Sequence, residues 1–138
     1  MSNLVRLSFS IEKPLVDQLE RLVKKNHYVN RSEFIRDMIR AKLVNQEWEA
    51  NEEAIGTITL LYDYHTRLLN EKLIELQHGF VGKVLASTHV NLDSTLCSEM
   101  IMVKGRAKRI NELCDSLQQL KGVLHAALSM TSTGKKLV

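Results

Sequence analysis

Strict alternation of apolar and polar residues marks the start of the chain. Val5, Leu7, Phe9 and Ile11 alternate with polar residues, which is the period of a strand with one buried face. A single strand is not stable alone, and no second strand pattern follows before the helical segments. We therefore expect the segment Leu4–Ile11 to pair antiparallel with the same segment of a second subunit about a two-fold axis.

The apolar period then changes to that of two helices. The spacing predicts a first helix that ends near Lys25 and a second that runs from Asn30 to about Asn45. Asn30 can cap the second helix, and Glu33 follows three residues later, as in a capping box. The apolar stripe of this second helix consists of Phe34, Ile35, Met38, Ile39 and Leu43.

A polar, acidic stretch separates these helices from a second patterned region. We expect a ribbon-type domain over residues 1–48, a linker over 49–55 and a second domain over 56–138. The order of elements in the second domain is β-α-β-β-α-β, which is typical of a ferredoxin-like, or ACT-like, sandwich, so the fold class is α+β. Its expected elements are the strand Thr57–Tyr62, the helix His65–His78, the strands Val84–Val90 and Cys97–Val103, a helix over 106–121 and the strand Val123–Met130.

Composition narrows the class of protein. The chain has 138 residues, of which 44% are hydrophobic and 25% charged, so it is globular rather than disordered. No stretch approaches the ~18 uninterrupted apolar residues of a membrane span. Two cysteines fit the reduced cytosol, so we expect a cytoplasmic protein. We find no nucleophile, acid/base pair or phosphate loop pattern, and we therefore do not expect an enzyme.

The basic residues gather in the first third of the chain. The net charge is +3, but residues 1–46 hold nine Lys and Arg against five Asp and Glu, whereas the remainder holds ten against eleven. A two-stranded ribbon fits the DNA major groove, and it would present Arg6, Ser8 and Ser10 on its polar face. The start of the second helix offers free backbone N–H groups beside Arg31 and Ser32, which suits a phosphate oxygen.

Each of these features also has an ordinary structural explanation. The first segment could be an edge strand with a solvated polar face, and the second helix could be an ordinary capped amphipathic helix. Taken together, the strand with Arg6, Ser8 and Ser10, the order of the elements and the sequence Asn30-Arg31-Ser32-Glu33 resemble the ribbon-helix-helix family of dimeric DNA-binding proteins. The resemblance implies a double-stranded DNA operator as partner.

Soft metal donors gather around the expected hairpin of the second domain. His89 and Asn91 alternate along one strand and so point to one face, and Cys97 begins the returning strand. His78 ends the preceding helix. A thiolate with imidazoles suits nickel, copper or zinc rather than a hard cation. Scattered His and Cys residues are more often part of ordinary packing, so this pattern alone leaves both readings open.

Along its whole length the chain resembles the nickel-responsive repressors of the NikR family. In that family three ligands come from one subunit in the pattern His-x-His-x5-Cys, and a fourth His, eleven positions earlier, comes from the neighbour. The pattern falls on His89, Asn91 and Cys97, with His78 eleven positions before His89. The resemblance also implies that Glu99 orients the ligands, and that the chain forms a homotetramer, a dimer of dimers held by the regulatory domains.

Asn91 departs from the family pattern, which has histidine at that position. An amide oxygen is a harder and weaker donor to nickel than an imidazole nitrogen. Three outcomes follow: weaker nickel binding with water or His65 as substitute, a tetrahedral zinc site, or no physiological metal. We expect metal sensing to persist with altered affinity, geometry or selectivity.

The family resemblance further suggests a cation site between the domains at Glu33 and Asp37, one helical turn apart. In the alternative, Glu33 completes the capping box and Asp37 pairs with Arg36 or Arg40. The predicted function is that of a metal-responsive, specifically nickel-responsive, repressor that binds a palindromic operator when loaded. The alternatives are a repressor that senses zinc, cobalt or a small molecule through its second domain, and a ribbon-helix-helix antitoxin.

Overall fold

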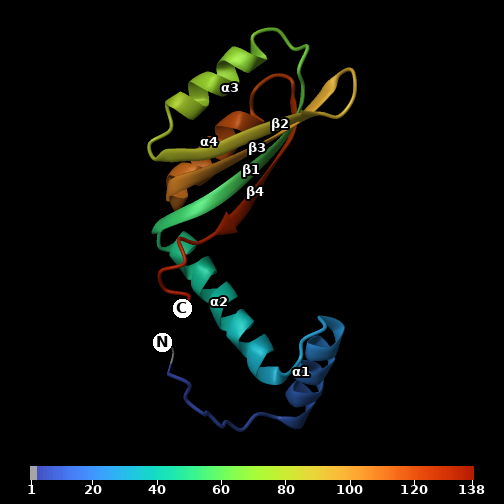
Figure 1. Ribbon diagram of the computed structural model, residues 1–138, viewed down its shortest axis with the longest axis vertical. Coiled ribbons are helices and arrows are strands. Elements are labelled where there is room, and N and C mark those ends of the chain that lie inside the picture. The colour runs from blue at the N-terminus through green and yellow to red at the C-terminus, as the bar shows by residue number, and fades with distance from the viewer. Residues whose placement is uncertain (1–2) are drawn as a thin grey trace. The chain divides into compact units, whose positions relative to one another are not determined.

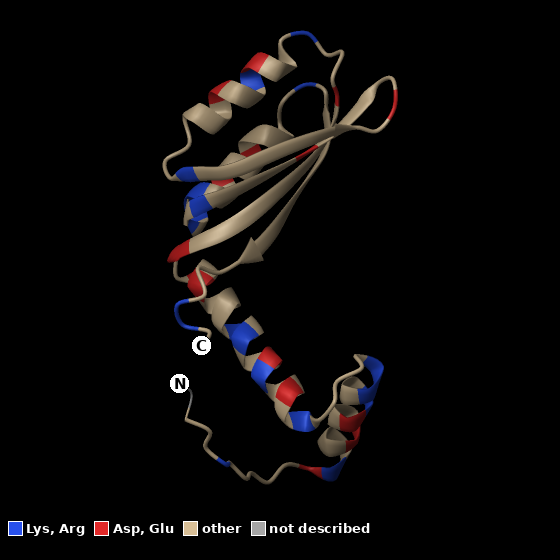
Figure 2. Cartoon of the chain, viewed as in Figure 1, with Lys and Arg blue, Asp and Glu red and all other residues tan. Residues whose placement is uncertain are grey.

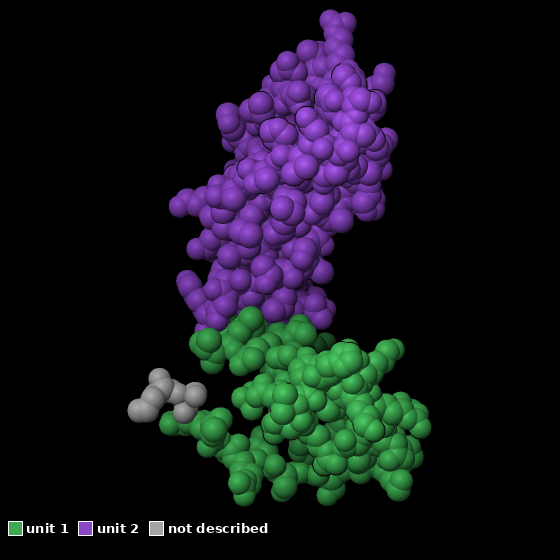
Figure 3. All heavy atoms as spheres, turned by 45° about the vertical axis from the view of Figure 1, so that its right-hand side comes forward, with its two compact units in different colours: residues 1–43, 136–138 green, residues 44–135 purple. Residues whose placement is uncertain are grey.

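Two helices precede a sheet that carries two further helices in the computed structural model, which describes residues 3–138 (Figure 1). The chain divides into two compact units, one of residues 1–43 with 136–138 and one of residues 44–135 (Figure 3). The division falls within a helix, after Leu43. The domain limits that the sequence predicts, 1–48 and 56–138, stay a prediction.

The first unit contains α1 (Lys13–Lys25) and most of α2 (Arg31–Glu49). The predicted cap of α2 is confirmed, because the Glu33 N–H donates to Asn30 Oδ1 over 3.0 Å. α2 extends four residues beyond the predicted end at Asn45. The added turn contains Trp48, which is buried and whose indole N–H donates to the Thr131 carbonyl over 2.8 Å.

Residues 3–12 contain neither helix nor strand. The predicted strand Leu4–Ile11 is therefore not formed within the single chain, because no other segment of this chain offers it a ladder of backbone hydrogen bonds. Its apolar residues are all exposed, with Leu7 78% and Phe9 63% accessible. The pairing of this segment with the same segment of a second subunit stays a prediction.

The second unit is a four-stranded antiparallel sheet in the order β2-β3-β1-β4. Its element order confirms the predicted β-α-β-β-α-β arrangement. Most of its boundaries lie within a few residues of prediction, although β1 begins before Gly56 and α3 begins after His65. The elements are β1 (Glu53–Asp63), α3 (Leu69–His78), β2 (Lys83–Asn91), β3 (Leu96–Arg106), α4 (Ala107–Gln118) and β4 (Val123–Thr131).

Both helices of this unit cover one face of the sheet, because their apolar residues join those of alternate strand positions in one core. Ile58 and Ile101 come from neighbouring strands, and Leu73 of α3 and Leu117 of α4 pack onto that face. Gly56 allows the close approach of α4, since a Cβ there would lie 2.9 Å from Ile110. Among the described residues, no helix is long and apolar enough to cross a membrane.

Candidate metal centre

The register of the sheet sets the predicted ligands side by side. Asn91 lies directly opposite Cys97, and His89 lies directly opposite Glu99. On the other side of Cys97, Tyr62 is its partner in β1. Because opposite residues of an antiparallel pair share a face, all five side chains project from the face that the helices cover. The alternation of His89 and Asn91 predicts this placement correctly.

A cavity of about 520 Å³ lies between this end of the sheet and α3. His89, Asn91 and Cys97 all line it, together with side chains from α3 such as Asn70 and Gln77. Cys97 is 1% exposed, whereas His89 and Asn91 are open to solvent. The three predicted donors of one chain therefore meet at a cavity that is closed on the thiol side and open on the side of β2.

Glu99 is held by three hydrogen bonds on the floor of this cavity. Tyr62 donates its hydroxyl to Oε1 over 3.2 Å. Gln77 and Ser87 donate to Oε2 over 3.1 and 3.2 Å. A carboxylate that is 8% exposed needs such donors to offset its lost hydration. With both oxygens occupied, Glu99 ties β1, β2 and the last turn of α3 together.

Tyr62, one of the three donors to Glu99, has a strongly raised pKa. Burial, then a hydrogen bond with the Cys97 side chain and the negative charge of Glu99, raise the pKa of Tyr62 well above its usual range. The phenol therefore keeps its proton and remains a hydrogen-bond donor between the thiol and the carboxylate. This residue connects the predicted ligand Cys97 to the predicted orienting residue Glu99.

His78 does not line the cavity, although its neighbour Gln77 does. It is the last residue of α3, close in sequence to Lys83, where β2 begins, whereas His89 and Asn91 lie at the opposite end of β2. Within the described residues, no group of three or more His, Cys, Asp or Glu side chains could hold a metal ion. One chain thus supplies His89, Asn91 and Cys97 to the cavity without His78.

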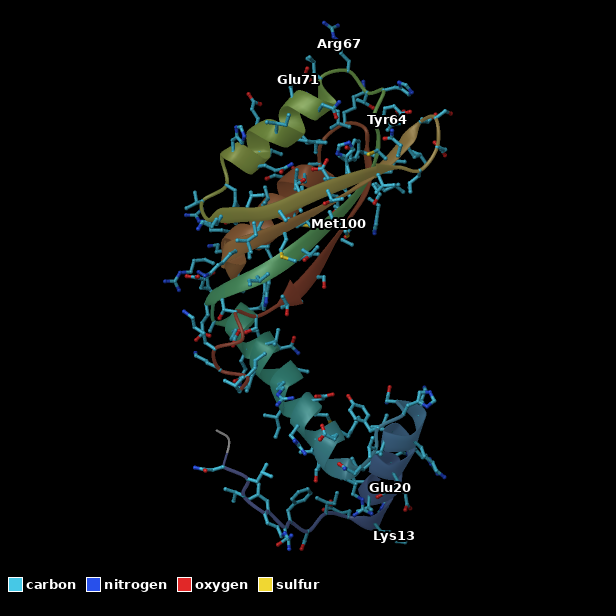
Figure 4. The ribbon with its side chains drawn as sticks, viewed as in Figure 1. Lys13, Glu20, Tyr64, Arg67, Glu71 and Met100 are labelled. Carbon is cyan, nitrogen blue, oxygen red and sulfur yellow. The ribbon has the colours of Figure 1, made fainter. Side chains whose placement is uncertain are left out.

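The hairpin between β2 and β3 is fixed by its own turn. Asp93 Oδ1 accepts from the backbone N–H groups of Thr95 and Leu96 over 2.7 and 2.8 Å. The bond from Leu96 and then that from Thr95 lower the pKa of Asp93, because both favour its charged form. The Ser94 carbonyl accepts from the hydroxyl of Tyr64, which is labelled in Figure 4, over 2.6 Å. The same carbonyl lies 2.8 Å from His65 Nε2.

His65 is therefore engaged with the hairpin backbone and does not line the cavity. Its proposed role as a substitute ligand stays a prediction. The second thiol, Cys114, is buried in α4 among core residues. Burial and the neighbouring Asp115 raise the pKa of Cys114, so it remains a neutral thiol, in keeping with its packing among apolar residues.

Sequence reasoning missed Tyr62 and Ser87 as partners of Glu99. Both lie inside predicted strands, Thr57–Tyr62 and Val84–Val90, but neither pattern assigns them a role. The alternation of β1 places Tyr62 on the same face as Ile58 and Leu60, but only the strand register brings its hydroxyl to Glu99. No signal in the sequence gives that register.

The predicted DNA-contacting residues lie in the first unit. Arg6, Ser8 and Ser10 are exposed within residues 3–12. Arg31 Nε forms an ion pair with Glu20 across the two helices, and Ser32 is exposed in the first turn of α2. Their contact with DNA stays a prediction.

The two predicted cation ligands both have partners within that unit. Glu33 pairs with Arg36 over 2.9 Å. Asp37 accepts from the Tyr28 hydroxyl over 2.7 Å and lies 3.6 Å from Arg40. These contacts match the alternative in which the carboxylates serve the helix, except that Glu33 pairs with Arg36 instead of completing the capping box.

The donor set around the cavity fits a borderline-soft transition metal. A thiolate and an imidazole suit nickel, zinc or copper, and the amide oxygen of Asn91 adds a harder and weaker donor. Magnesium and calcium prefer oxygen donors throughout, and the one carboxylate of this cavity, Glu99, is already occupied by three hydrogen bonds. With only one thiolate and one imidazole from one chain, a nitrogen- and sulfur-rich site requires a further strong donor from outside that chain.

Comparison with known proteins matches both parts of the chain. Residues 55–131 match the model of the NikR C terminal nickel binding domain, and residues 5–46 match that of the ribbon-helix-helix protein, copG family. A protein of Geobacter sulfurreducens named "Putative nickel-responsive regulator" is 44% identical over 138 residues, which is 99% of each chain. A protein of the same name from Thermococcus kodakarensis is 43% identical over 98% of this chain and 99% of its own.

Among solved structures, the uncharacterized protein TM1266 from Thermotoga maritima is similar with a TM-score of 0.51 and 18% sequence identity. The match covers 57% of this chain and 98% of that protein. At this identity the similarity concerns the fold alone.

Proposed function

The chain belongs to the NikR family of nickel-responsive regulators, and on that premise we propose that it represses transcription by binding a DNA operator in response to the metal. The single observation that carries this proposal is the placement of His89, Asn91 and Cys97 around one cavity, within a domain whose family binds nickel. It is a regulator and not an enzyme.

In this proposal His89 and Cys97 hold nickel from one chain, and Asn91 is a weaker third donor. When bound, the metal supplies a strong cross-link between its ligands, which stabilises whichever arrangement brings those ligands together. Tyr62 and Glu99 fix the inner wall of the cavity through their hydrogen bond. Glu99 also holds Gln77, next to His78, so it connects the cavity to the end of α3.

The edge position of β2 explains how His78 can join a site that it does not reach in its own chain. β2 is an outer strand of the sheet. If two copies pair antiparallel along this edge, the Lys83 end of one strand lies beside the Asn91 end of the other. Such a pair would carry His78 of each chain toward His89 of its neighbour. We therefore assign the fourth ligand, His78, to the neighbouring chain.

The proposed assembly is a homotetramer, with a ribbon-helix-helix dimer at each end. Paired N-terminal segments would present Arg6, Ser8 and Ser10 to operator bases in the major groove. Arg31 and Ser32 at the start of α2 would hold the DNA backbone. Nickel would favour the arrangement in which both ribbons meet one palindromic operator. The two free thiols, Cys97 and Cys114, fit action in the reducing cytoplasm.

Asn91 supports a second candidate, in which the same site prefers zinc or cobalt. With one amide in place of an imidazole, a tetrahedral arrangement of His78, His89, Cys97 and water becomes a competitive donor set. The repressor would then respond to another metal through the same residues.

The test is a metal titration of the reduced full chain, followed by operator binding with and without nickel. We expect saturation at one nickel per chain and tighter operator binding in its presence. Cys97→Ser should bind nickel only weakly and lose the nickel-dependent gain in operator binding, while Cys114→Ser, which removes the other thiol, should leave both intact. If Cys97→Ser binds nickel as tightly as the wild type, or if nickel leaves operator binding unchanged, the proposal is wrong.

A further inference from the structure

The cavity at the candidate metal centre is larger than a metal ion requires. Its volume is about 520 Å³, which lies within the range of about 300–1,000 Å³ that is usual for small-molecule sites. A water molecule takes about 30 Å³ of liquid volume, so an ion with one bound water would fill only a small part of the cavity. The remaining space is large enough for a small organic molecule beside the metal.

Three polar side chains of this cavity are not engaged with the rest of the chain. Asn70 of α3 and His89 and Asn91 of β2 all line the cavity, and their side chains form no hydrogen bond with any other described residue. Gln77 and Ser87, in contrast, both donate to Glu99. The three unengaged side chains therefore offer an imidazole and two amides to a bound molecule.

Two neighbouring residues of α3 give the same cavity an apolar wall. Leu73 is 2% exposed and Ile74 is 53% exposed, and both line the cavity. Sites for small organic molecules combine such apolar walls with a few polar groups that fix the orientation of the ligand. The apolar wall favours a ligand with a flat hydrocarbon or heteroaromatic part over a fully hydrated one.

The charges around the cavity favour a neutral ligand. Among the residues that the structure describes, no Lys or Arg lines the cavity, and its one carboxylate, Glu99, already accepts three hydrogen bonds. The strand β2 carries a single charged residue, Lys83 at its first position, and is tan over the rest of its length in Figure 2. An anionic ligand would find no cationic side chain at the cavity to hold it.

We propose that this chain binds nickel together with a small neutral molecule that carries an imidazole-type nitrogen, which we call the co-ligand. The proposal rests on the proposed function, in which Asn91 is the weakest donor of the site. A heteroaromatic nitrogen is a stronger donor to nickel than the Asn91 amide oxygen, so the co-ligand would supply the donor that residue 91 lacks. Its second ring nitrogen would donate to an amide oxygen, for which Asn70 is available, and its ring would lie against Ile74.

Imidazole itself is the probe for this proposal, with Asn91→His as the matched control. Nickel affinity of the reduced full chain is measured by competitive titration with and without imidazole. Free imidazole also binds nickel in solution and weakens the apparent affinity of both proteins equally, so the quantity to compare is the ratio of wild-type to Asn91→His affinity. With an imidazole Kd of about 2 mM at the site, about 10 mM imidazole should raise this ratio roughly sixfold. An unchanged ratio would overturn the proposal.

A variant that fills the cavity tests where imidazole binds. Ile74→Trp places a large ring in the space that the co-ligand needs, and the half-exposed position of Ile74 tolerates a larger side chain. This variant should bind nickel as the wild type does without imidazole, and it should lose the gain that imidazole gives. Leu124→Trp is the control, because Leu124 is 62% exposed on β4 and does not line the cavity, and it should keep the gain. A full gain in Ile74→Trp would show that imidazole does not act in this cavity.

The co-ligand and the metal would strengthen each other's binding. By thermodynamic reciprocity, the co-ligand raises nickel affinity by the same factor by which nickel raises the affinity for the co-ligand. The regulator would then respond most strongly to nickel when the co-ligand is also present.

The same titrations separate this inference from the proposed function. A wild type that binds nickel and shows no gain with imidazole refutes only the co-ligand. A wild type that binds nickel neither with nor without imidazole refutes the proposed function as well. Nickel binding that becomes tight only in the presence of imidazole supports both.

Discussion

Asn91 and Cys97 face each other directly across β2 and β3, at the mouth of the cavity that carries the candidate metal centre. Cross-strand partners lie about 4.5–5.5 Å apart at Cβ, so a donor on residue 91 can bind a metal held by the Cys97 sulfur. Residue 91 is therefore placed to add a donor beside the Cys97 sulfur.

Asn91→His should raise nickel affinity by at least about tenfold, or ~1.4 kcal/mol, because an imidazole nitrogen is a stronger donor to nickel than an amide oxygen. The measurement is a competitive nickel titration of the reduced apoprotein. Asn91→Gln is the control, since it keeps the amide, and it should not strengthen binding. An unchanged affinity for Asn91→His would remove residue 91 from the site.

Tyr62→Phe should destabilise the second unit by about 1–3 kcal/mol, because it leaves Oε1 of the buried Glu99 without its donor. Chemical unfolding of the metal-free protein measures this. Tyr64→Phe is the matched control, because the Tyr64 hydroxyl bonds an exposed carbonyl at Ser94. If the two variants are equally stable, the Tyr62 hydroxyl has no special role in holding Glu99.

From the sequence, most of the helices and strands could be predicted, but not how the strands pair. The alternation of His89 and Asn91 placed both on one face, and the helical spacing found α2 and α4 within a few residues of their limits. Asn30 identified the start of α2 through its cap. These are local properties, set by backbone geometry over a few residues.

The remainder depends on contacts between distant parts of the chain. The bond from Tyr62 to Glu99 joins residues 37 positions apart, and it exists only because β1 and β3 pair in one register. The extension of α2 to Glu49 follows from the burial of Trp48 and its bond to Thr131. The segment Leu4–Ile11 shows the opposite case, because its alternating pattern predicts a strand and the single chain forms none there.

Removal of the Asp93 carboxylate should weaken the hairpin that carries Asn91 and Cys97. Since the pKa of Asp93 is lowered in the folded chain, its stabilising effect is present above the unfolded value of about 3.9 and is lost as the pH falls through the lower folded value. Asp93→Asn should therefore be less stable than the wild type at pH 6, and the difference should shrink below pH 4. Thermal unfolding at both pH values measures this, and a difference that grows in acid would contradict the assignment.

Arg6→Ala should abolish discrimination between the operator and unrelated DNA, because an arginine that contacts base edges accounts for about 1–3 kcal/mol of specificity and occurs twice in a paired ribbon. The measurement compares binding to both DNA sequences at one fixed salt concentration, since salt alone changes such affinities. Arg67→Ala is the control, because it removes an exposed arginine from the second unit (Figure 4). Retained selectivity in Arg6→Ala would exclude Arg6 from base contact.

Mixing two inactive variants should restore part of the metal binding if His78 acts in the neighbouring chain. His78→Ala and Cys97→Ala should each bind nickel weakly, because each loses one strong donor from every site. In a mixed pair along the β2 edge, the His78→Ala chain keeps its own His89 and Cys97 and receives the intact His78 of its neighbour. The other site of that pair lacks both donors. After unfolding and refolding at equal amounts, about a quarter of the sites should therefore recover, on the statistics of random pairing in a two-fold assembly. If His78 served its own chain, each chain of the mixture would still lack one donor, and nickel binding would stay at the level of the separate variants.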